Sequence, residues 1–201
     1  MDGMWQQYCG GPKTPSVDAY ILDLGVLVPC PPLRRRVALV PAMRMAAFEL
    51  DGAIYACGGV TGPAYYTATV PYVLSLDPRT PGWQSWDDMP TPVSNAGVAV
   101  VGSRIYVVGG EARGARPMDE FAQLAAVQCY DAQAGRWDTV TRFAPMRVAR
   151  SAHVVAALCG WVVVMGGRGD EPMYWPPTNT WEWCTPLPST HSFARACVVH
   201  V

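Results

Sequence analysis

The sequence predicts an all-β protein made of four repeated units, each with four short antiparallel strands. Gly-Gly pairs recur at intervals of roughly 50 residues, and the last three pairs each end a short apolar run. A tryptophan follows each of those three pairs, at the end of a second motif with constant internal spacing. Turn residues separate the apolar runs, as they do between short strands. The glycine pairs are Gly10-Gly11, Gly58-Gly59, Gly109-Gly110 and Gly166-Gly167.

A β-hairpin is expected before each of the last three glycine pairs. The turn signals are Asp51-Gly52, Gly102-Ser103 and Cys159-Gly160, and residues of this kind supply the positive φ that tight hairpin turns require. The segments FELDGAIYACGG, VAVVGSRIYVVGG and VVAALCGWVVVMGG are therefore predicted hairpins. In the first unit Asp2-Gly3 takes the turn position, ahead of the poorer copy QQYCGG.

Two further strands are expected after each hairpin. The segments LDPRTPGW, YDAQAGRW and YWPPTNTW have identical spacing. In each, a hydrophobic residue ends the third strand, a turn follows, and the tryptophan begins the fourth strand. These tryptophans are Trp83, Trp137 and Trp181, whereas the first unit has Pro29 at that position.

Four-stranded units of this kind are the blades of a β-propeller. The order of turn, I-Y-x-x-G-G, Y-D-x-x-x-x-x-W and M-P-x-x-x-R resembles the kelch repeat over the whole chain, most specifically in the second and third units. The predicted single domain spans residues 1–201, in units of approximately 1–50, 51–101, 102–158 and 159–201. Glycine lets neighbouring blades approach closely and tryptophan fills the wedge between them. The residues expected to have this structural role are Gly58, Gly59, Gly109, Gly110, Gly166, Gly167, Trp83, Trp137 and Trp181.

The ends of the chain predict how the ring closes. The chain starts at a hairpin turn, and its last segment, CVVHV at residues 197–201, resembles a first strand. The N- and C-terminal strands could therefore pair and complete one blade from both ends, as the resemblance implies. Kelch propellers usually have six blades, sometimes five or seven. Two possibilities stay open: a compact four-bladed ring, and a truncated relative that needs a second chain.

Composition argues against several classes of function. The net charge is −1 without a strongly basic block, which argues against nucleic-acid binding. The longest apolar stretch, residues 152–167, is shorter than a membrane span and contains His153 and Gly160. The seven cysteines include no Cys-x-x-Cys pair, and the N-terminus has no signal-peptide pattern. We therefore expect a cytoplasmic protein with reduced cysteines, no membrane association and no nucleic-acid partner.

The sequence predicts a partner-binding surface on one face. The connections after the glycine pairs and those after the fourth strands emerge on the same face, because successive strands alternate in direction. They vary in length and polarity, and arginine and tyrosine suit contact with a protein or peptide, in particular an acidic one. Self-association is a further expectation, and neither a cofactor nor a metal is expected. The candidate contact residues are Arg113, Arg116, Arg150, Arg168, Tyr65, Tyr66 and His191.

The resemblance implies a more specific function. Kelch proteins that are substrate receptors for cullin-type ubiquitin ligases bind acidic peptides through arginines on this face, which by position implicates Arg168 and Arg150. Val93 takes the matching place in the second unit, so this chain departs from that pattern. Since residue 2 already falls in a repeat, the expectation is a kelch-only chain without BTB and BACK domains. Such a chain could bind a partner as a competitor or decoy.

Two sequence features suggest functions other than binding of an intracellular partner. Some kelch-type propellers are carbohydrate-acting enzymes, namely copper radical oxidases similar to galactose oxidase and sialic-acid mutarotases. The histidines His153, His191 and His200 are too scattered to predict a copper site, and no catalytic triad pattern is present, so the prediction is not an enzyme. The tripeptide 168–170, Arg-Gly-Asp, is found in integrin ligands, but a short intracellular connection is the better interpretation here.

Overall fold

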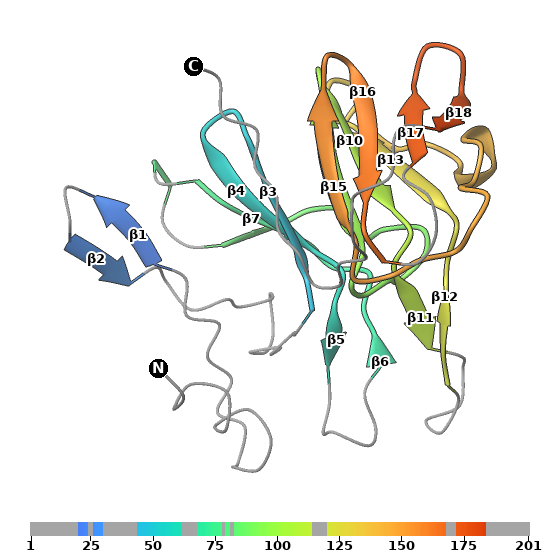
Figure 1. Cartoon of the computed structure of the whole chain (residues 1–201). Coiled ribbons are helices and arrows are strands. Elements are labelled where there is room, and N and C mark those ends of the chain that lie inside the picture. The colour runs from blue at the N-terminus through green and yellow to red at the C-terminus, as the bar shows by residue number, and fades with distance from the viewer. Residues whose placement is uncertain are drawn as a thin grey trace.

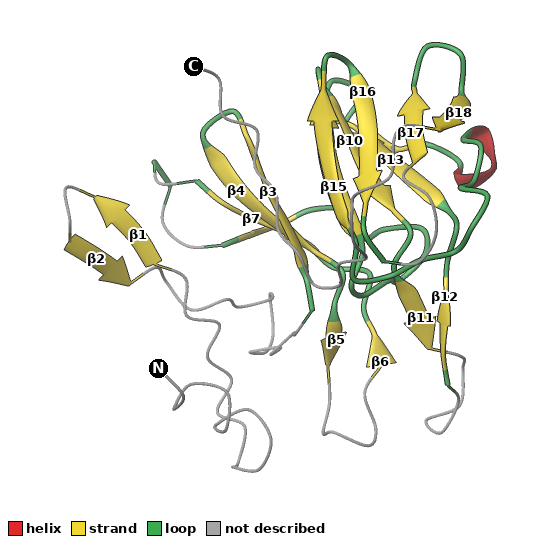
Figure 2. Cartoon of the chain, in the orientation of Figure 1, coloured by secondary structure: helices red, strands yellow, loops and turns green. Residues whose placement is uncertain are grey.

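The computed structural model describes three four-stranded sheets, three two-stranded sheets and the connections between them. The described residues are 20–23, 26–29, 44–61, 68–77, 79–80, 83–113, 120–167 and 172–183. Within these residues the secondary structure is β-strand apart from one 3-10 turn at Val140–Arg142, as Figure 2 shows. None of the described helical segments is long and apolar enough to cross a membrane. The chain is therefore all-β, as the sequence predicts.

Three four-stranded antiparallel sheets form the body of the protein (Figure 1). In each sheet the strands lie in chain order, and every neighbouring pair is antiparallel. The first sheet contains β3 (Ala46–Leu50), β4 (Ala53–Cys57), β7 (Val73–Leu76) and β8 (Gln84–Ser85). The second contains β9 (Gly97–Val101), β10 (Arg104–Val108), β13 (Val127–Asp131) and β14 (Arg136–Trp137). The third contains β15 (Val154–Leu158), β16 (Trp161–Met165), β17 (Pro172–Trp175) and β18 (Thr180–Trp183).

Three two-stranded sheets complete the described structure. Two of them interrupt the four-stranded sheets between the second and third strands, where the sequence predicts loops. In each, the two sides of the connection pair across it, with Val60 opposite Thr69 and Glu111 opposite Gln123. The small sheets are β1 (Tyr20–Asp23) with β2 (Val26–Pro29), β5 (Val60–Thr61) with β6 (Ala68–Thr69), and β11 (Glu111–Arg113) with β12 (Phe121–Gln123).

The three predicted hairpins are confirmed. They are β3–β4, β9–β10 and β15–β16, each in the register that the turn signals imply. Asp51 and Gly52 have φ of 52° and 78°, Gly102 has 60°, and Cys159 and Gly160 have 49° and 83°. Each four-stranded sheet therefore takes its first strand from the end of one sequence unit and the others from the next. Closure by residues 197–201 and by the N-terminal turn lies outside the described residues.

The core lies between the sheets, where facing side chains interdigitate. One apolar cluster joins the first and second sheets and includes Tyr55, Met89 and Val107. A second joins the second and third sheets and includes Tyr106 and Tyr174. Alternate strand residues point to opposite faces, so the second sheet contributes to both clusters. This face-to-face stacking of consecutive sheets is the arrangement of propeller blades.

The repeated tryptophans connect neighbouring sheets by hydrogen bonds as well as by packing. The indole N–H of Trp137 donates to the carbonyl oxygen of Asp87 at 3.1 Å. The indole of Trp181 donates to the carbonyl of Ala144 at 2.8 Å. Asp87 and Ala144 occupy the same place in the repeat, two residues before Met89 and Met146. The tryptophan of one blade therefore holds the loop of the blade before it, while Trp83 is half-buried just before β8.

We expect Trp181→Phe to lower the free energy of unfolding by about 1 kcal/mol. Phenylalanine keeps an aromatic ring against the core but leaves the Ala144 carbonyl without its donor. Trp183→Phe is the matched control, because Trp183 is 44% exposed and should change stability by less than about 0.5 kcal/mol. Urea unfolding followed by fluorescence measures both. Equal effects of the two substitutions would contradict a role for the Trp181 hydrogen bond.

Candidate functional site

The candidate site is built on the two hairpins that follow the glycine pairs. The β5–β6 and β11–β12 hairpins leave the four-stranded sheets on the same side, because β4 and β10 run in the same direction within their blades (Figure 1). Strand β6 lies against β11. The two hairpins therefore form one continuous surface, which we call the hairpin face.

Hydrogen bonds hold the base of this face to the loops that lead into the next blade. The N–H of Gly59 donates to the carbonyl of Val93 at 2.8 Å, and the N–H of Gly110 donates to the carbonyl of Arg150 at 2.9 Å. Val93 and Arg150 therefore occupy equivalent positions, as the repeat alignment predicts. The third equivalent residue, His191, lies outside the described residues. The second glycine of each pair thus ties the base of its hairpin to the loop of the next blade in the same way.

A half-buried carboxylate organises the polar part of the hairpin face. Glu111, at the start of β11, accepts hydrogen bonds from Arg44 Nη1 at 3.0 Å and Asn95 Nδ2 at 2.9 Å through Oε1. Its Oε2 accepts one from Ser151 Oγ at 3.3 Å. The Glu111 side chain is 14% exposed and that of Arg44 is 50% exposed. The carboxylate of Glu111 is thus bound by neighbouring groups of the protein, while part of the Arg44 guanidinium faces solvent.

Arg44 was missed by the sequence interpretation, although a structural repeat places it. Arg44, Asn95 and Ala152 each stand two residues before the first strand of a blade, and each has a positive φ, of 60°, 51° and 54°. The N–H of Asn95 donates to the carbonyl of Arg44, and that of Ala152 to the carbonyl of Asn95, both at 3.0 Å. Counting back from each hairpin turn could have identified this position in the first unit.

Two arginines lie over one aromatic ring on the hairpin face. The guanidinium carbon of Arg113 is 5.0 Å from the centre of the Phe121 ring, and that of Arg44 is 5.9 Å away. Arg113 and Phe121 are paired across the β11–β12 hairpin. Both distances are within the range of cation–π attraction. The structure thus places the predicted residue Arg113 on a positively charged, partly aromatic surface together with Arg44.

Arg150, another predicted contact residue, does not lie on the surface as expected. Its side chain is 1% exposed, and Nη1 donates to the carbonyl of Gly166 at 3.1 Å. The guanidinium therefore lies between blades and does not reach the surface in this conformation. It is buried because the chain around it pairs with Gly110 and Leu124 at the base of the hairpin, which draws the side chain inward. A partner contact through Arg150 stays a prediction.

His153 lies in the same interior. Burial, with a smaller effect from the charge of Arg150, lowers the pKa of His153 to about 4. The ring is therefore neutral near pH 7. Its Nε2 is 3.1 Å from the carbonyl oxygen of Val108, and a carbonyl can only accept, so the proton of the neutral ring is on Nε2. His153 joins the second and third blades.

The remaining predicted contact residues lie outside the described residues. They are Arg116, Arg168, Tyr65, Tyr66 and His191. The same holds for the tripeptide at 168–170. Each of these positions stays a prediction.

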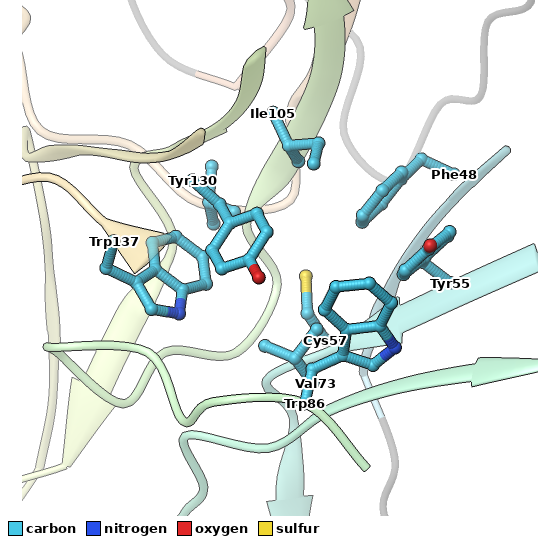
Figure 3. Close-up of a pocket in the computed structure, with 9 residues that line it drawn as sticks. Phe48, Tyr55, Cys57, Val73, Trp86, Ile105, Tyr130 and Trp137 are labelled. Atoms are coloured by element: carbon cyan, nitrogen blue, oxygen red, sulfur yellow. The ribbon is translucent and has the colours of Figure 1, made fainter. Parts of the chain in front are cut away.

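One small cavity lies between the first and second sheets, with Cys57, Trp86 and Tyr130 among the residues around it (Figure 3). Its volume of about 10 Å³ is roughly the space that a single water needs. Trp86 stands between Tyr55 and Tyr130. The centre of its ring is 5.5 Å from that of Tyr55 and 5.9 Å from that of Tyr130. Burial raises the pKa of the Cys57 thiol to about 12, so Cys57 is a packed thiol. This cavity is a packing gap between blades and has no room for a substrate.

Chemistry-bearing groups are otherwise dispersed in the part of the chain that the structure describes. There, no three His, Cys, Asp or Glu side chains come together as metal ligands would. Cys57, Cys129 and Cys159 are unpaired by disulfides. The arrangement best suited to recognise another molecule is therefore the arginine–phenylalanine surface of the hairpin face.

Comparison with known proteins gives a consistent set of relatives. No protein-family model matches the chain. Kelch-like protein terF of Aspergillus terreus is 28% identical over 149 residues, which cover 68% of this chain and 31% of the relative. Kelch-like protein 36 of Mus musculus is 29% identical over 134 residues, covering 63% and 21%. Kelch-like protein 26 of Danio rerio is 24% identical over 160 residues, covering 75% and 24%.

The similarities extend over most of this chain, which spans less than a third of the length of each of these three relatives. They agree with the structure, in which consecutive four-stranded antiparallel sheets stack face to face with glycine pairs and tryptophans at equivalent positions. Repeat motif, sheet order and sequence similarity agree: the chain carries kelch repeats, and its all-β fold of stacked four-stranded sheets is that of kelch β-propeller blades.

Proposed function

We propose that this protein is an interaction module that binds a protein or peptide partner through the hairpin face. The observation that carries the proposal is the placement of Arg44 and Arg113 over the ring of Phe121. Aromatic rings and arginines are the side chains that contribute most often to the strongest contacts in protein interfaces. Here Arg113 and Phe121 stand on the β11–β12 hairpin, and Arg44 reaches the same ring from the residues just before β3.

The two arginines over Phe121 favour an acidic partner. Glu111 is engaged by Arg44, Asn95 and Ser151, so its carboxylate offers little to a partner. A guanidinium recognises carboxylates in a planar, two-pronged geometry while its face contacts an aromatic ring. An extended segment with aspartate or glutamate matches this surface better than a basic or wholly apolar one.

We also propose which kind of partner binds this face. The partner would be the substrate of a cullin-type ubiquitin ligase, and this chain would take part in recognising it or would compete for it as a decoy. We also propose a cytoplasmic location, which the unpaired thiols of Cys57 and Cys129 support. Self-association is the remaining proposal for partners, and binding is proposed in place of catalysis.

Charge reversal at Arg113 tests the proposed surface. We expect Arg113→Glu to weaken binding of a fluorescein-labelled glutamate-rich peptide at least tenfold, because a carboxylate beside Phe121 repels acidic ligands. Arg136→Glu is the matched control, since Arg136 is an exposed arginine of β14, in the four-stranded sheet of the same blade, and pairs with Asp131 at the end of β13 that lies away from the hairpin. Fluorescence anisotropy measures both affinities, and a thermal melt shows whether folding is unchanged.

The control decides the outcome. Arg136→Glu should change the affinity less than twofold. If both variants weaken binding equally, the peptide responds to net charge alone and the proposed surface is wrong. A lysine-rich peptide that binds as tightly as the glutamate-rich one would also contradict the proposal.

A further inference from the structure

Strand β12 has an outer edge whose backbone groups point away from β11. On the other side of this hairpin, the N–H and C=O of Glu111 pair with Ser94 at 2.8 and 2.9 Å, so these groups point away from β12. Glu111 and Gln123 are opposite each other in the ladder. In such a non-hydrogen-bonded pair both residues direct their backbone groups outward. Gln123, and by the two-residue period Phe121, therefore present N–H and C=O at the outer edge of β12.

This edge is open in the described structure. Ala122 and Gln123 are exposed and Phe121 is half-buried. Strand β6 lies on the other side, against β11. The connection between β10 and β13 spans residues 109–126, whereas the equivalent connection in the next blade spans only residues 166–171. No strand of the described residues therefore lies against the outer edge of β12, and an unpaired edge is a template for an added strand.

The two faces of the hairpin differ in chemistry. Because side chains alternate along a strand, Phe121 lies on one face with its partner Arg113, and Ala122 lies on the other with its partner Ala112. Glu120 precedes Phe121 and so falls on the face of Ala122. In a strand added to β12, every second side chain would lie on the face of Arg113 and Arg44. The side chains between them would lie on the face of Ala122 and Glu120.

We propose that an acidic partner segment binds in extended form as an additional strand on the outer edge of β12. Its backbone pairs with Phe121 and Gln123, every second side chain is a carboxylate that meets Arg113 and Arg44, and the intervening side chains are small and uncharged. Main-chain pairing supplies affinity and alternate side chains supply specificity in this mode of recognition. The proposal rests on the proposed function, because it takes the hairpin face as the partner-binding surface.

The backbone of the ligand provides the sharpest test. The probe is a fluorescein-labelled peptide of alternating glutamate and threonine, compared with two versions that are N-methylated at all glutamates or at all threonines. A strand that pairs along one edge directs only alternate N–H groups to its neighbour. We therefore expect one methylated version to lose at least tenfold in affinity and the other to bind within about threefold of the parent peptide.

A substitution at the edge gives an independent test. Gln123→Pro removes the outward N–H, whereas Gln123→Ala keeps it; both lose the side-chain hydrogen bond to Ser151. We expect at least a tenfold loss of peptide affinity for Gln123→Pro and less than a twofold change for Gln123→Ala. If the proline variant does not fold in a thermal melt, the methylated peptides on the unmodified protein still decide the question.

The experiments distinguish an error in strand addition from an error in the choice of the hairpin face. If both methylated peptides bind as the parent does, or if the two Gln123 variants are equal, strand addition is wrong, while a loss with Arg113→Glu still supports the hairpin face. If Arg113→Glu has no effect either, the hairpin face is not the binding surface. Absence of binding by the alternating glutamate–threonine peptide also overturns strand addition.

Discussion

Gly109→Ala should lower the free energy of unfolding by about 3 to 4 kcal/mol. Gly109 has φ of +62°, and a Cβ there would stand 2.7 Å from the carbonyl oxygen of Arg150 and 2.8 Å from atoms of His153 and Met146. A left-handed conformation costs an L-residue about 1 to 2 kcal/mol, and overpacking adds about 1 to 3 kcal/mol. Urea unfolding monitored by tryptophan fluorescence measures the loss.

Gly102→Ala separates the two causes. Gly102 has φ of +60°, nearly the same as Gly109, but a Cβ there meets no atom within 4 Å. We expect this variant to lose only the conformational part, about 1 to 2 kcal/mol. Equal losses in the two variants would show that the close approach of the Arg150 loop to Gly109 does not contribute to stability.

Tyr174→Ala should lower the free energy of unfolding by about 4 kcal/mol. Tyr174 is 0% exposed and lies between the second and third sheets. Its ring centre is 6.0 Å from that of Tyr106 and 5.0 Å from that of Trp181. Truncation removes these contacts and opens a cavity between two sheets that a rigid stack cannot close. Differential scanning calorimetry or urea unfolding measures the change.

Tyr174→Phe is the matched control. The Tyr174 hydroxyl donates to Asn179 Oδ1 at 2.8 Å, but the same oxygen also accepts from the N–H of Ala144 at 2.7 Å. Because Asn179 keeps a donor, we expect a loss of only about 1 kcal/mol. A loss for Tyr174→Ala no larger than that for Tyr174→Phe would contradict the packing of the third sheet on the second.

The local elements of the fold could be predicted because short-range chemistry specifies them. The turn residues at 51–52, 102–103 and 159–160 require positive φ, and hairpins form at all three positions. The third strands end near the hydrophobic residues expected for them, and Trp137 and Trp181 lie in the fourth strands. The hairpins β5–β6 and β11–β12 were expected as loops, since strands of two or three residues are too short to show a clear alternation.

The candidate site could be predicted only in part. Arg113 was identified because it follows a glycine pair, and it lies beside Phe121 on the hairpin face. Arg150 was identified by its repeat position, but that position does not say whether a side chain points outward. The structure shows that its side chain is buried against Gly166. Arg44 was missed because the degenerate first unit obscures the count that aligns it with Asn95 and Ala152.

The sequence by itself determined the repeat, the four-stranded unit and the resemblance to kelch repeats, because turn chemistry, strand alternation and glycine spacing are local properties of the chain. Only the tertiary structure decided which charges reach the surface. Arg44 is far in sequence from Glu111 and Phe121, and the stacking of one blade on the next brings it into contact with both. The same stacking places Arg150 inside, since the space left between packed sheets depends on both of them.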